Sequence, residues 1–245
     1  MKKSILLVAV ASLFVSTIVN AQWSTDKKTV KGNGKVTTET RTTTDYDGIK
    51  IAGFFDVDLI AGKEGKITVK GEENLLAAVK IEVEGSDLKI YVEKGTQIRP
   101  SSGQKIQITV PFEKISELSL AGSGNIKSKD VIKSENFAIK LAGSGNFTLP
   151  VDANNLDLSV SGSGNINLKG TADKFTTKLS GSGDIDASDL KSKVVDANVS
   201  GSGNSKVTCN ESITARVAGS GNIKYIGNPE KKDVKVSGSG TITKG

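Results

Sequence analysis

Small and aliphatic residues alternate in a pattern that recurs seven times along the second half of the chain. The units are LSLAGSGNIK (118–127), IKLAGSGNFT (139–148), SVSGSGNINL (159–168), TKLSGSGDID (177–186), ANVSGSGNSK (197–206), ARVAGSGNIK (215–224) and VKVSGSGTIT (234–243). The first glycine of each unit, here position 0, is Gly122, Gly143, Gly162, Gly181, Gly201, Gly219 or Gly238. Successive units are 18 to 21 residues apart, and a sustained period of this length is typical of a solenoid.

Apolar side chains occupy fixed positions in every unit. Position −2 is always leucine or valine, and position +4 is apolar in six units and Ser205 in the other. Position −6 is apolar in the five middle units. A spacing of two residues is the period of a β-strand, so we predict that positions −2 and +4 are buried. At Ser205 we predict a local strand shift, with Val207 and Cys209 filling the core.

The unit and its repetition together predict an all-β fold, a parallel β-helix with rungs of about 19 residues. A single rung cannot bury its own apolar face, whereas stacked rungs share one core. The glycines would serve either by adopting a positive φ or by allowing backbones to approach closely. Position +3 predicts a ladder of side-chain amides along the stack, formed by Asn125, Asn146, Asn165, Asn204 and Asn222, interrupted by Asp184 and ending in Thr241.

The rest of the chain keeps the strand period without the GSG unit. We assign residues 45–245 to the β-helix, with irregular rungs and an end cap over 45–115 and regular repeats over 116–245. ENLLAAVK (73–80) is the one plausible helical turn. Residues 22–44 are rich in threonine, and we expect an extended, poorly ordered lead-in with at most an edge strand.

The first residues have the features of a secretory signal peptide. Two lysines precede an uncharged apolar run, which closes on Val19-Asn20-Ala21 with small residues at −3 and −1 of the expected cleavage site. We predict that residues 1–21 are removed near Ala21 and that the mature chain has no membrane span. The protein is therefore expected in the periplasm or at the cell surface.

The composition excludes several classes of function. The chain has no histidine, which excludes Ser-His-Asp and Cys-His catalysis and removes the commonest transition-metal ligand. Its formal charge of +6 is spread along the sequence, and nucleic-acid binding would need a concentrated basic patch. Cys209 is the only cysteine, so no intramolecular disulfide can form.

One acidic cluster is the candidate for a metal or acid–base site. Asp184, Asp186 and Asp189 lie close together in GSGDIDASD, which would suit a Ca²⁺ site or an acid pair for glycoside cleavage. The alternative is an outward-facing, solvated strand. No other residue pattern indicates a cofactor.

The order of these pieces resembles a known family. IKIAGFFDVDLIAG (49–62), with the GxFDVxL element at Gly53–Leu59, is followed by ENLL, then by KIQITVPFEKISELSLAGSGNI (105–126) and the GSGN units. Together these pieces are similar to the head GIN domain family of exported, autotransporter-adhesin-like proteins, over roughly residues 45–243. The resemblance implies a parallel β-helix and an adhesin-like role, and it brings no catalytic residues.

We therefore expect an exported, non-enzymatic, adhesin-like binding module whose partner is a carbohydrate or another component of the cell envelope. A structural envelope scaffold without a small ligand is the first alternative, and a polysaccharide-active enzyme is the second.

Overall fold

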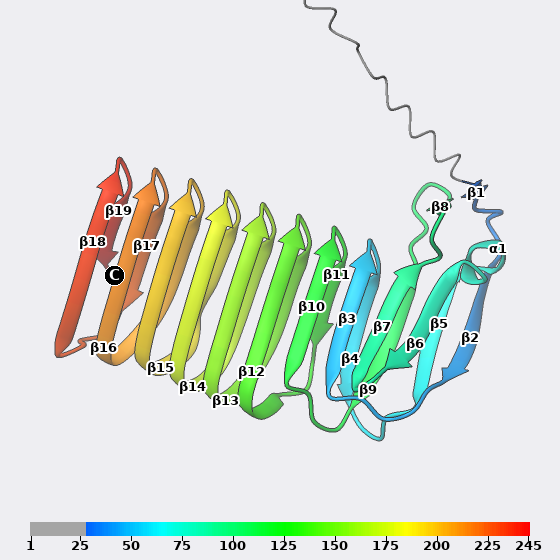
Figure 1. Cartoon of the computed structure of the whole chain (residues 1–245), viewed down its shortest axis with the longest axis horizontal. Coiled ribbons are helices and arrows are strands. Elements are labelled where there is room, and N and C mark those ends of the chain that lie inside the picture. Colours follow the sequence, from blue (N-terminus) through cyan, green and yellow to red (C-terminus); the bar gives the residue numbers. More distant parts are fainter. Residues whose placement is uncertain (1–27) are drawn as a thin grey trace, which may run out of the picture.

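The computed structural model describes residues 28–245 and shows an elongated β-solenoid (Figure 1). Strands make up 73% of these residues and helix 2%. No helix in this part of the chain is long and apolar enough to cross a membrane. The signal peptide predicted for residues 1–21 lies outside the described residues.

The cap and the first rungs consist of β1 (Lys28–Lys31), β2 (Val36–Thr42), β3 (Gly48–Gly53), β4 (Asp56–Ala61), β5 (Lys66–Glu72), α1 (Glu73–Leu76), β6 (Val79–Glu84), β7 (Asp87–Val92), β8 (Thr96–Arg99) and β9 (Gln107–Phe112). The repeats consist of β10 (Glu117–Gly122), β11 (Asn125–Ser128), β12 (Ile132–Gly143), β13 (Asn146–Gly162), β14 (Asn165–Gly181), β15 (Asp184–Gly201), β16 (Asn204–Gly219), β17 (Asn222–Ile226), β18 (Lys231–Gly238) and β19 (Thr241–Lys244).

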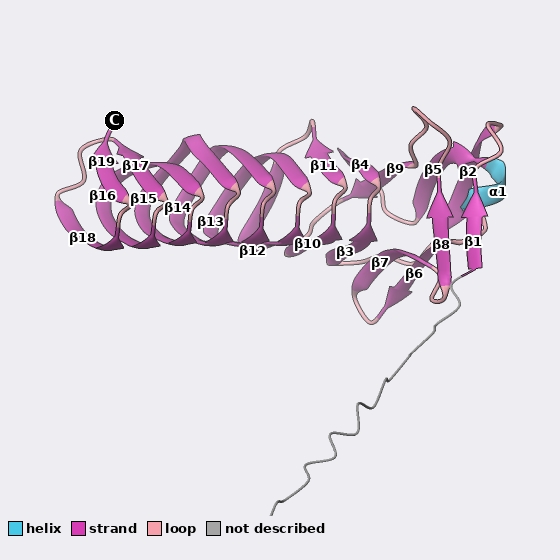
Figure 2. Cartoon of the chain, turned by 90° about the horizontal axis from the view of Figure 1, so that it is seen from above, coloured by secondary structure: helices cyan, strands magenta, loops and turns pink. Residues whose placement is uncertain are grey.

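The repeats stack in parallel, one unit per rung, as the sequence predicts. Each strand pairs with its neighbour so that the position-0 glycines meet: Gly143 pairs with Gly162, and Gly162 pairs with Gly181. The rungs follow one another along the axis, with one sheet on each side of the core (Figure 2). The GSG segment forms the narrow edge where the chain passes from one sheet to the other.

The core follows the predicted columns. In the first six repeats, the side chains at positions −2 and +4 are at most 3% exposed, and so are those at −4 and −6 in the middle repeats. The seventh repeat differs because no rung covers its outer side within the described residues. There Val236, at position −2, is 41% exposed.

The two glycines of each unit have different tasks, so both roles suggested by the sequence are present. Gly162, at position 0, has a φ of 133°, a conformation that favours glycine. Gly164, at position +2, is required for close packing, because a Cβ there would lie 1.9 Å from the carbonyl oxygen of Gly145 in the rung below. The GSG segment of each rung therefore packs directly against the backbone of the preceding rung.

Near the N-terminal end, the rungs are not stacked in the order in which their strands occur in the sequence. β3 pairs in parallel with β7 on one side and β10 on the other, and β4 lies between β9 and β11 in the same way. The chain therefore forms the β3–β4 rung, continues through β5–β9 on its outer side, and returns at β10 to its inner side. From β10 onward the two orders coincide.

Antiparallel strands close this end of the stack. β5 pairs with β2 and β9, and β6 pairs with β7, all antiparallel, while β1 and β8 form a separate two-stranded sheet. The helical turn expected in 73–80 is α1, in which Leu75 and Leu76 are buried.

The expectation of a poorly ordered lead-in is corrected for residues 28–44. β2 is the expected edge strand, and polar contacts fasten it to the cap. The Arg41 guanidinium donates to the carbonyl oxygens of Leu76, at 2.6 Å, and Val79. The Glu72 carboxylate accepts hydrogen bonds from the Gly34 amide and from the amide and hydroxyl of Ser101. Threonine content alone did not reveal these partners.

The strand shift predicted at Ser205 is wrong. Ser205 stays in register between Ile185 and Ile223, and its buried hydroxyl has no hydrogen-bond partner among the described residues. The register shift lies further along β15, between Ala187 and Lys191, where that strand carries its extra residues. Val207 and Cys209 are fully buried as expected.

Candidate functional surface

Three shallow hollows lie in one line on the sheet that contains β7, β3, β10, β12–β16 and β18. Their volumes are about 440, 450 and 260 Å³, from the N-terminal end to the C-terminal end. The two hollows over the repeats are lined by side chains at positions −1 and −3 of successive rungs. The hollow at the N-terminal end is lined by Ala52, Lys89 and Tyr91, at the equivalent positions, together with Glu82, Glu84 and Lys94. We call this line of hollows the trough.

The floor of the trough is made of small side chains. Position −1 points outward because position −2 points into the core, and it holds only alanine or serine from β3 to β18: Ala52, Ala121, Ala142, Ser161, Ser180, Ser200, Ala218 and Ser237. At the N-terminal end, Tyr91 on β7 takes the equivalent place beside Ala52. Methyl groups therefore line the floor from β3 to β12, and hydroxyl groups line it from β13 to β15 and again at β18.

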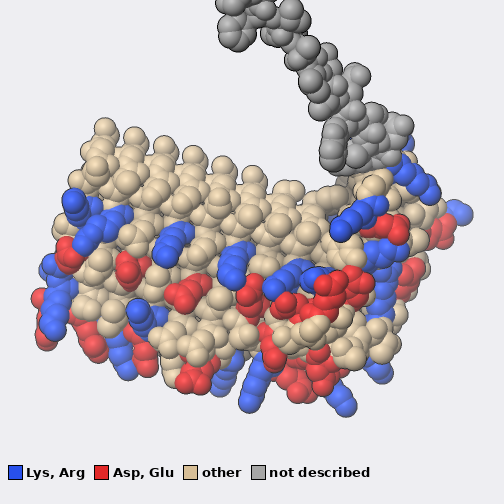
Figure 3. Space-filling model, in the orientation of Figure 1, with Lys and Arg blue, Asp and Glu red and all other residues tan. Residues whose placement is uncertain are grey.

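Longer side chains at position −3 form one wall. From β7 to β18 they are Lys89, Lys50, Ser119, Lys140, Ser159, Lys178, Asn198, Arg216 and Lys235. Between β3 and β16, a cation occurs at every second rung and a neutral polar residue at each rung between. Figure 3 shows basic side chains in a row across this face, below a band without charged residues.

Acidic residues alternate with these cations on the next outward column. Position −5 holds Glu117, Ala138, Asp157, Thr176, Asp196, Thr214 and Asp233, so acidic rungs fall between the cationic rungs at −3 until the last. Rungs are about 4.8 Å apart, and two like charges at that distance repel by about 1 kcal/mol in water. The alternation separates like charges by about 9–10 Å and places opposite charges on adjacent rungs.

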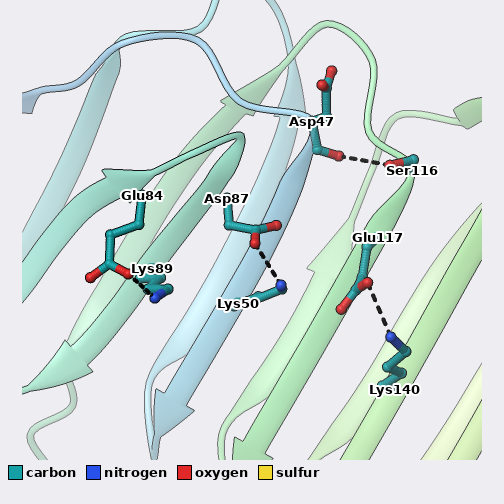
Figure 4. Close-up of polar contacts among 8 residues, drawn as sticks. All are labelled: Asp47, Lys50, Glu84, Asp87, Lys89, Ser116, Glu117 and Lys140. Atoms are coloured by element: carbon teal, nitrogen blue, oxygen red, sulfur yellow. Dashed lines mark hydrogen bonds and ion pairs between the residues drawn. The ribbon is translucent and has the colours of Figure 1, made fainter.

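Ion pairs between neighbouring rungs result from this alternation (Figure 4). Lys50 contacts Asp87 at 2.6 Å, and Lys140 contacts Glu117 at 3.0 Å. The hydrogen bond to Asp87 raises the pKa of Lys50. Exposed ion pairs of this kind contribute only about 0–1 kcal/mol each to the stability of a protein. We therefore infer that they order the surface side chains rather than stabilise the fold.

The same pairing recurs at the far end of the trough. Arg216 donates to the Asp233 carboxylate on the next rung, and this hydrogen bond is the main cause that lowers the pKa of Asp233. Lys178 and Lys235 have no ion-pair partner among residues 28–245. Their ammonium groups are therefore free to bind a ligand.

The predicted amide ladder at position +3 is present on the other side of the GSG edge. Asn146 donates to Asn125 at 2.8 Å, Asn165 to Asn146 at 3.1 Å, and Asn222 to Asn204 at 2.9 Å. The ladder ends at Thr241 as predicted, and at the N-terminal end it extends beyond the predicted column to Asp56.

Asp184 interrupts this ladder on one side only. It accepts a hydrogen bond from the Asn204 amide at 2.8 Å. No side-chain hydrogen bond joins it to Asn165 in the described part of the chain, because a carboxylate has no proton to donate to the amide oxygen of Asn165.

The three candidate aspartates do not converge on one point. Asp184 lies in the ladder; Asp186 accepts from the amide and hydroxyl of Ser188, which lowers its pKa, and lies 3.8 Å from Lys206. Asp189 is exposed beside Lys169 of the next strand. Residues 28–245 contain no group of three acidic or cysteine side chains placed to hold a metal ion.

Cys209 has no surroundings that would activate it. It is fully buried, its thiol donates to the carbonyl oxygen of Ser212 at 2.9 Å, and burial raises its pKa. A reactive cysteine needs accessible thiolate, so this residue serves as core filling.

The trough was not predicted from the sequence, although its signal was there. Aligning the units on position 0 and reading outward positions, rather than inward ones, shows the alternation of charge at −3 and −5. A further hollow of about 790 Å³ lies at the opposite margin, lined by the loop residues Asp47 and Lys114 and by residues of β12 and β13, including Lys133. It does not recur from rung to rung.

The stacked rungs, the GSG edge and the capped N-terminal end define a class of repetitive β-solenoid. The chain belongs to the family described as "Putative auto-transporter adhesin, head GIN domain", whose sequence model matches residues 45–229. This is the family indicated by the GxFDVxL and GSGN elements.

Solved structures with the same fold come from Bacteroides and Parabacteroides. A "putative adhesin" from Bacteroides fragilis has a TM-score of 0.82 at 24% identity, covering 88% of this chain and 99% of its own. A "putative lipid binding protein" from Parabacteroides distasonis has a TM-score of 0.70 at 30% identity, covering 89% and 100%. A "putative adhesin" from Parabacteroides merdae has a TM-score of 0.70 at 24% identity, covering 89% and 99%. A comparison with curated proteins gave no match.

Proposed function

We propose that this protein is an exported, adhesin-like binding module without enzymatic activity, which holds a linear polymer lengthwise in the trough. The observation that carries the proposal is the trough itself, a shallow surface that repeats a small residue on its floor at every rung and a cation on its wall at every second rung. A repetitive surface is suited to a repetitive ligand, since each rung presents similar groups to each segment of the polymer. The family name and two of the three structures described above point in the same direction.

A carbohydrate of the cell envelope is the polymer that we propose. Serine hydroxyls, asparagine amides and ammonium groups along the trough can all hydrogen-bond to sugar hydroxyls or carboxylates. The hollows are open and shallow, whereas a small-molecule site encloses most of its ligand. Aromatic stacking contributes at one end only, where Tyr91 lines the hollow between β3 and the cap.

A lipid ligand, suggested by the name of the Parabacteroides distasonis structure, is less well supported. An acyl chain needs an apolar cavity, and the interior here is filled by aliphatic and aromatic side chains from β3 to β16. The alanines of the trough floor present only methyl groups on an open surface, and the serines from β13 onward add hydroxyl groups. The proposal that the protein is exported is supported by the predicted signal peptide and by the family name.

A glycan array with two matched variants tests the proposal. Ser161→Arg fills the floor of the trough at an exposed position, while Asn167→Arg adds the same side chain to the opposite sheet. Both changes are at the surface and should shift stability by less than about 0.5 kcal/mol.

We expect the unmodified protein and Asn167→Arg to bind the same glycans, and Ser161→Arg to lose at least tenfold in affinity. Equal binding by all three would place the ligand elsewhere. No binding to glycans or to isolated envelope fractions would favour the scaffold alternative, and turnover of a polysaccharide would favour the enzyme.

A further inference from the structure

The C-terminal rung has an open edge on both sheets. β18 pairs only with β16, and β19 only with β17, among the described strands. Val234 and Val236 on β18 are 49% and 41% exposed, although the side chains at the same positions in the preceding repeats are at most 3% exposed. An open strand edge with apolar side chains is a template for pairing with another strand.

The opposite end of the molecule offers no matching rung. It is closed by the antiparallel strands β2, β5 and β6, by α1 and by the β1–β8 pair (Figure 2). Its free edges, on β2 and β6, belong to antiparallel strands, so head-to-tail stacking of one copy on another would not continue the parallel rungs. The remaining arrangement for identical copies joins two C-terminal rungs about a two-fold axis, which makes β18 of each copy antiparallel to β18 of the other.

Charge complementarity selects the register of this pairing. When the two Val234 residues lie opposite each other, Asp233 of each copy lies opposite Lys235 of the other. A shift of one step places Val234 opposite Val236 and the two Lys235 residues against each other. Opposite charges across an antiparallel pair stabilise it, and like charges destabilise it.

We propose that this protein forms a two-fold dimer through the β18 edge, in the register that pairs Val234 with Val234 and Asp233 with Lys235. The two Val234 side chains then meet across the interface, and Val236 of each copy lies opposite Lys232 of the other. Lys235, which has no ion-pair partner in the described chain, shares the Asp233 carboxylate of the other copy with Arg216. Both troughs lie on the same face of the dimer, because the axis is perpendicular to the sheets.

Sedimentation of the full-length chain over a concentration series tests the dimer, with three variants. Val234→Lys places a charge at the centre of the interface, and Lys235→Glu sets two acidic residues against each other. Lys178→Glu is the matched control, since it reverses an exposed, unpaired charge in the same column three rungs away. Circular dichroism shows whether each variant keeps its strand content.

We expect a reversible dimer for the unmodified protein and for Lys178→Glu, and at least a tenfold weaker dimer for Val234→Lys and Lys235→Glu. The double change Asp233→Lys with Lys235→Glu should recover dimerisation, because it restores opposite charges across the interface. A chain that is monomeric at every concentration, a dimer that neither single variant weakens, or an open-ended polymer would each overturn the proposal.

Discussion

Replacing Gly164 by valine tests the close packing of the GSG edge. A Cβ at this position would lie 1.9 Å from the carbonyl oxygen of Gly145 and 2.5 Å from the Leu141 side chain. Ordinary contacts of a Cβ are 3.4 Å or more, so the backbone of the rung below would have to move by about 1.5 Å. The leucine could change rotamer, but the carbonyl oxygen belongs to the stacked backbone and cannot.

The expected loss is about 3–5 kcal/mol, at the upper end of what overpacking causes. A shift of that size would also stretch the hydrogen bonds that hold the edge, such as Ser163 amide to Gly143 carbonyl at 3.0 Å. For a chain of this length each kcal/mol lowers the melting temperature by about 2–4 °C, so Gly164→Val should melt about 6–20 °C earlier.

Urea unfolding monitored by circular dichroism measures this effect, with Lys169→Ala as the control. Lys169 is exposed in β14, the strand that follows Gly164, and its truncation should change stability by less than about 0.5 kcal/mol. If the two variants unfold at the same urea concentration, the contact between neighbouring edges does not limit the side chain at position +2, and the account of the glycine column is wrong.

Three further predictions concern buried or paired polar groups. Ser205→Ile should raise the denaturant midpoint slightly, by removing an unpaired buried hydroxyl, whereas Ile185→Ser in the same column should lose about 2–4 kcal/mol; equal midpoints would contradict this. Asp184→Asn should stabilise by about 0.5–1.5 kcal/mol, because an amide can donate to Asn165 and complete the ladder; no change in the thermal melt would mean that water already fills the gap. Hydrogen bonds from Ser101, above all, lower the pKa of Glu72, so its stabilisation is present above the ordinary glutamate pKa of about 4.3 and is lost as the pH falls through the lower folded value. Hydrogen exchange in the cap should quicken over that range, and Glu72→Gln should remove this pH dependence; an unchanged profile would refute it.

The inward side of the rungs could be predicted from the sequence, because a buried position repeats the same kind of side chain on every turn. Leu120 and Ile126 mark the columns that the structure places in the core. The sequence indicated two possible roles for the glycines, a positive φ or a close approach of two backbones. It could not assign a role to each glycine, because both roles require the same residue type. Ser205 is misleading because a lone hydroxyl in an apolar column suggests a local shift, whereas the stack contains unpaired buried hydroxyls at both Ser205 and Thr177.

The pairing of the early rungs could not be predicted. β3, β7 and β10 share a period of two and similar lengths. No feature of the local sequence therefore indicates that β3 lies between the other two strands. That arrangement depends on contacts between residues far apart in the chain. The trough was missed for a different reason: outward positions vary from rung to rung, and their order becomes visible only when alternate rungs are compared.

The placement of the β3–β4 rung between later strands has a consequence for how the protein folds. Its pairing with β10 and β11 joins residues 69 positions apart, as in Ile126 with Val57, whereas each later rung pairs with residues only 17 to 21 positions back. Closing the long loop is entropically expensive and slow, and closing the short ones is fast. Folding should therefore wait for the cap and then run toward the C-terminus, each finished rung acting as the template for the next.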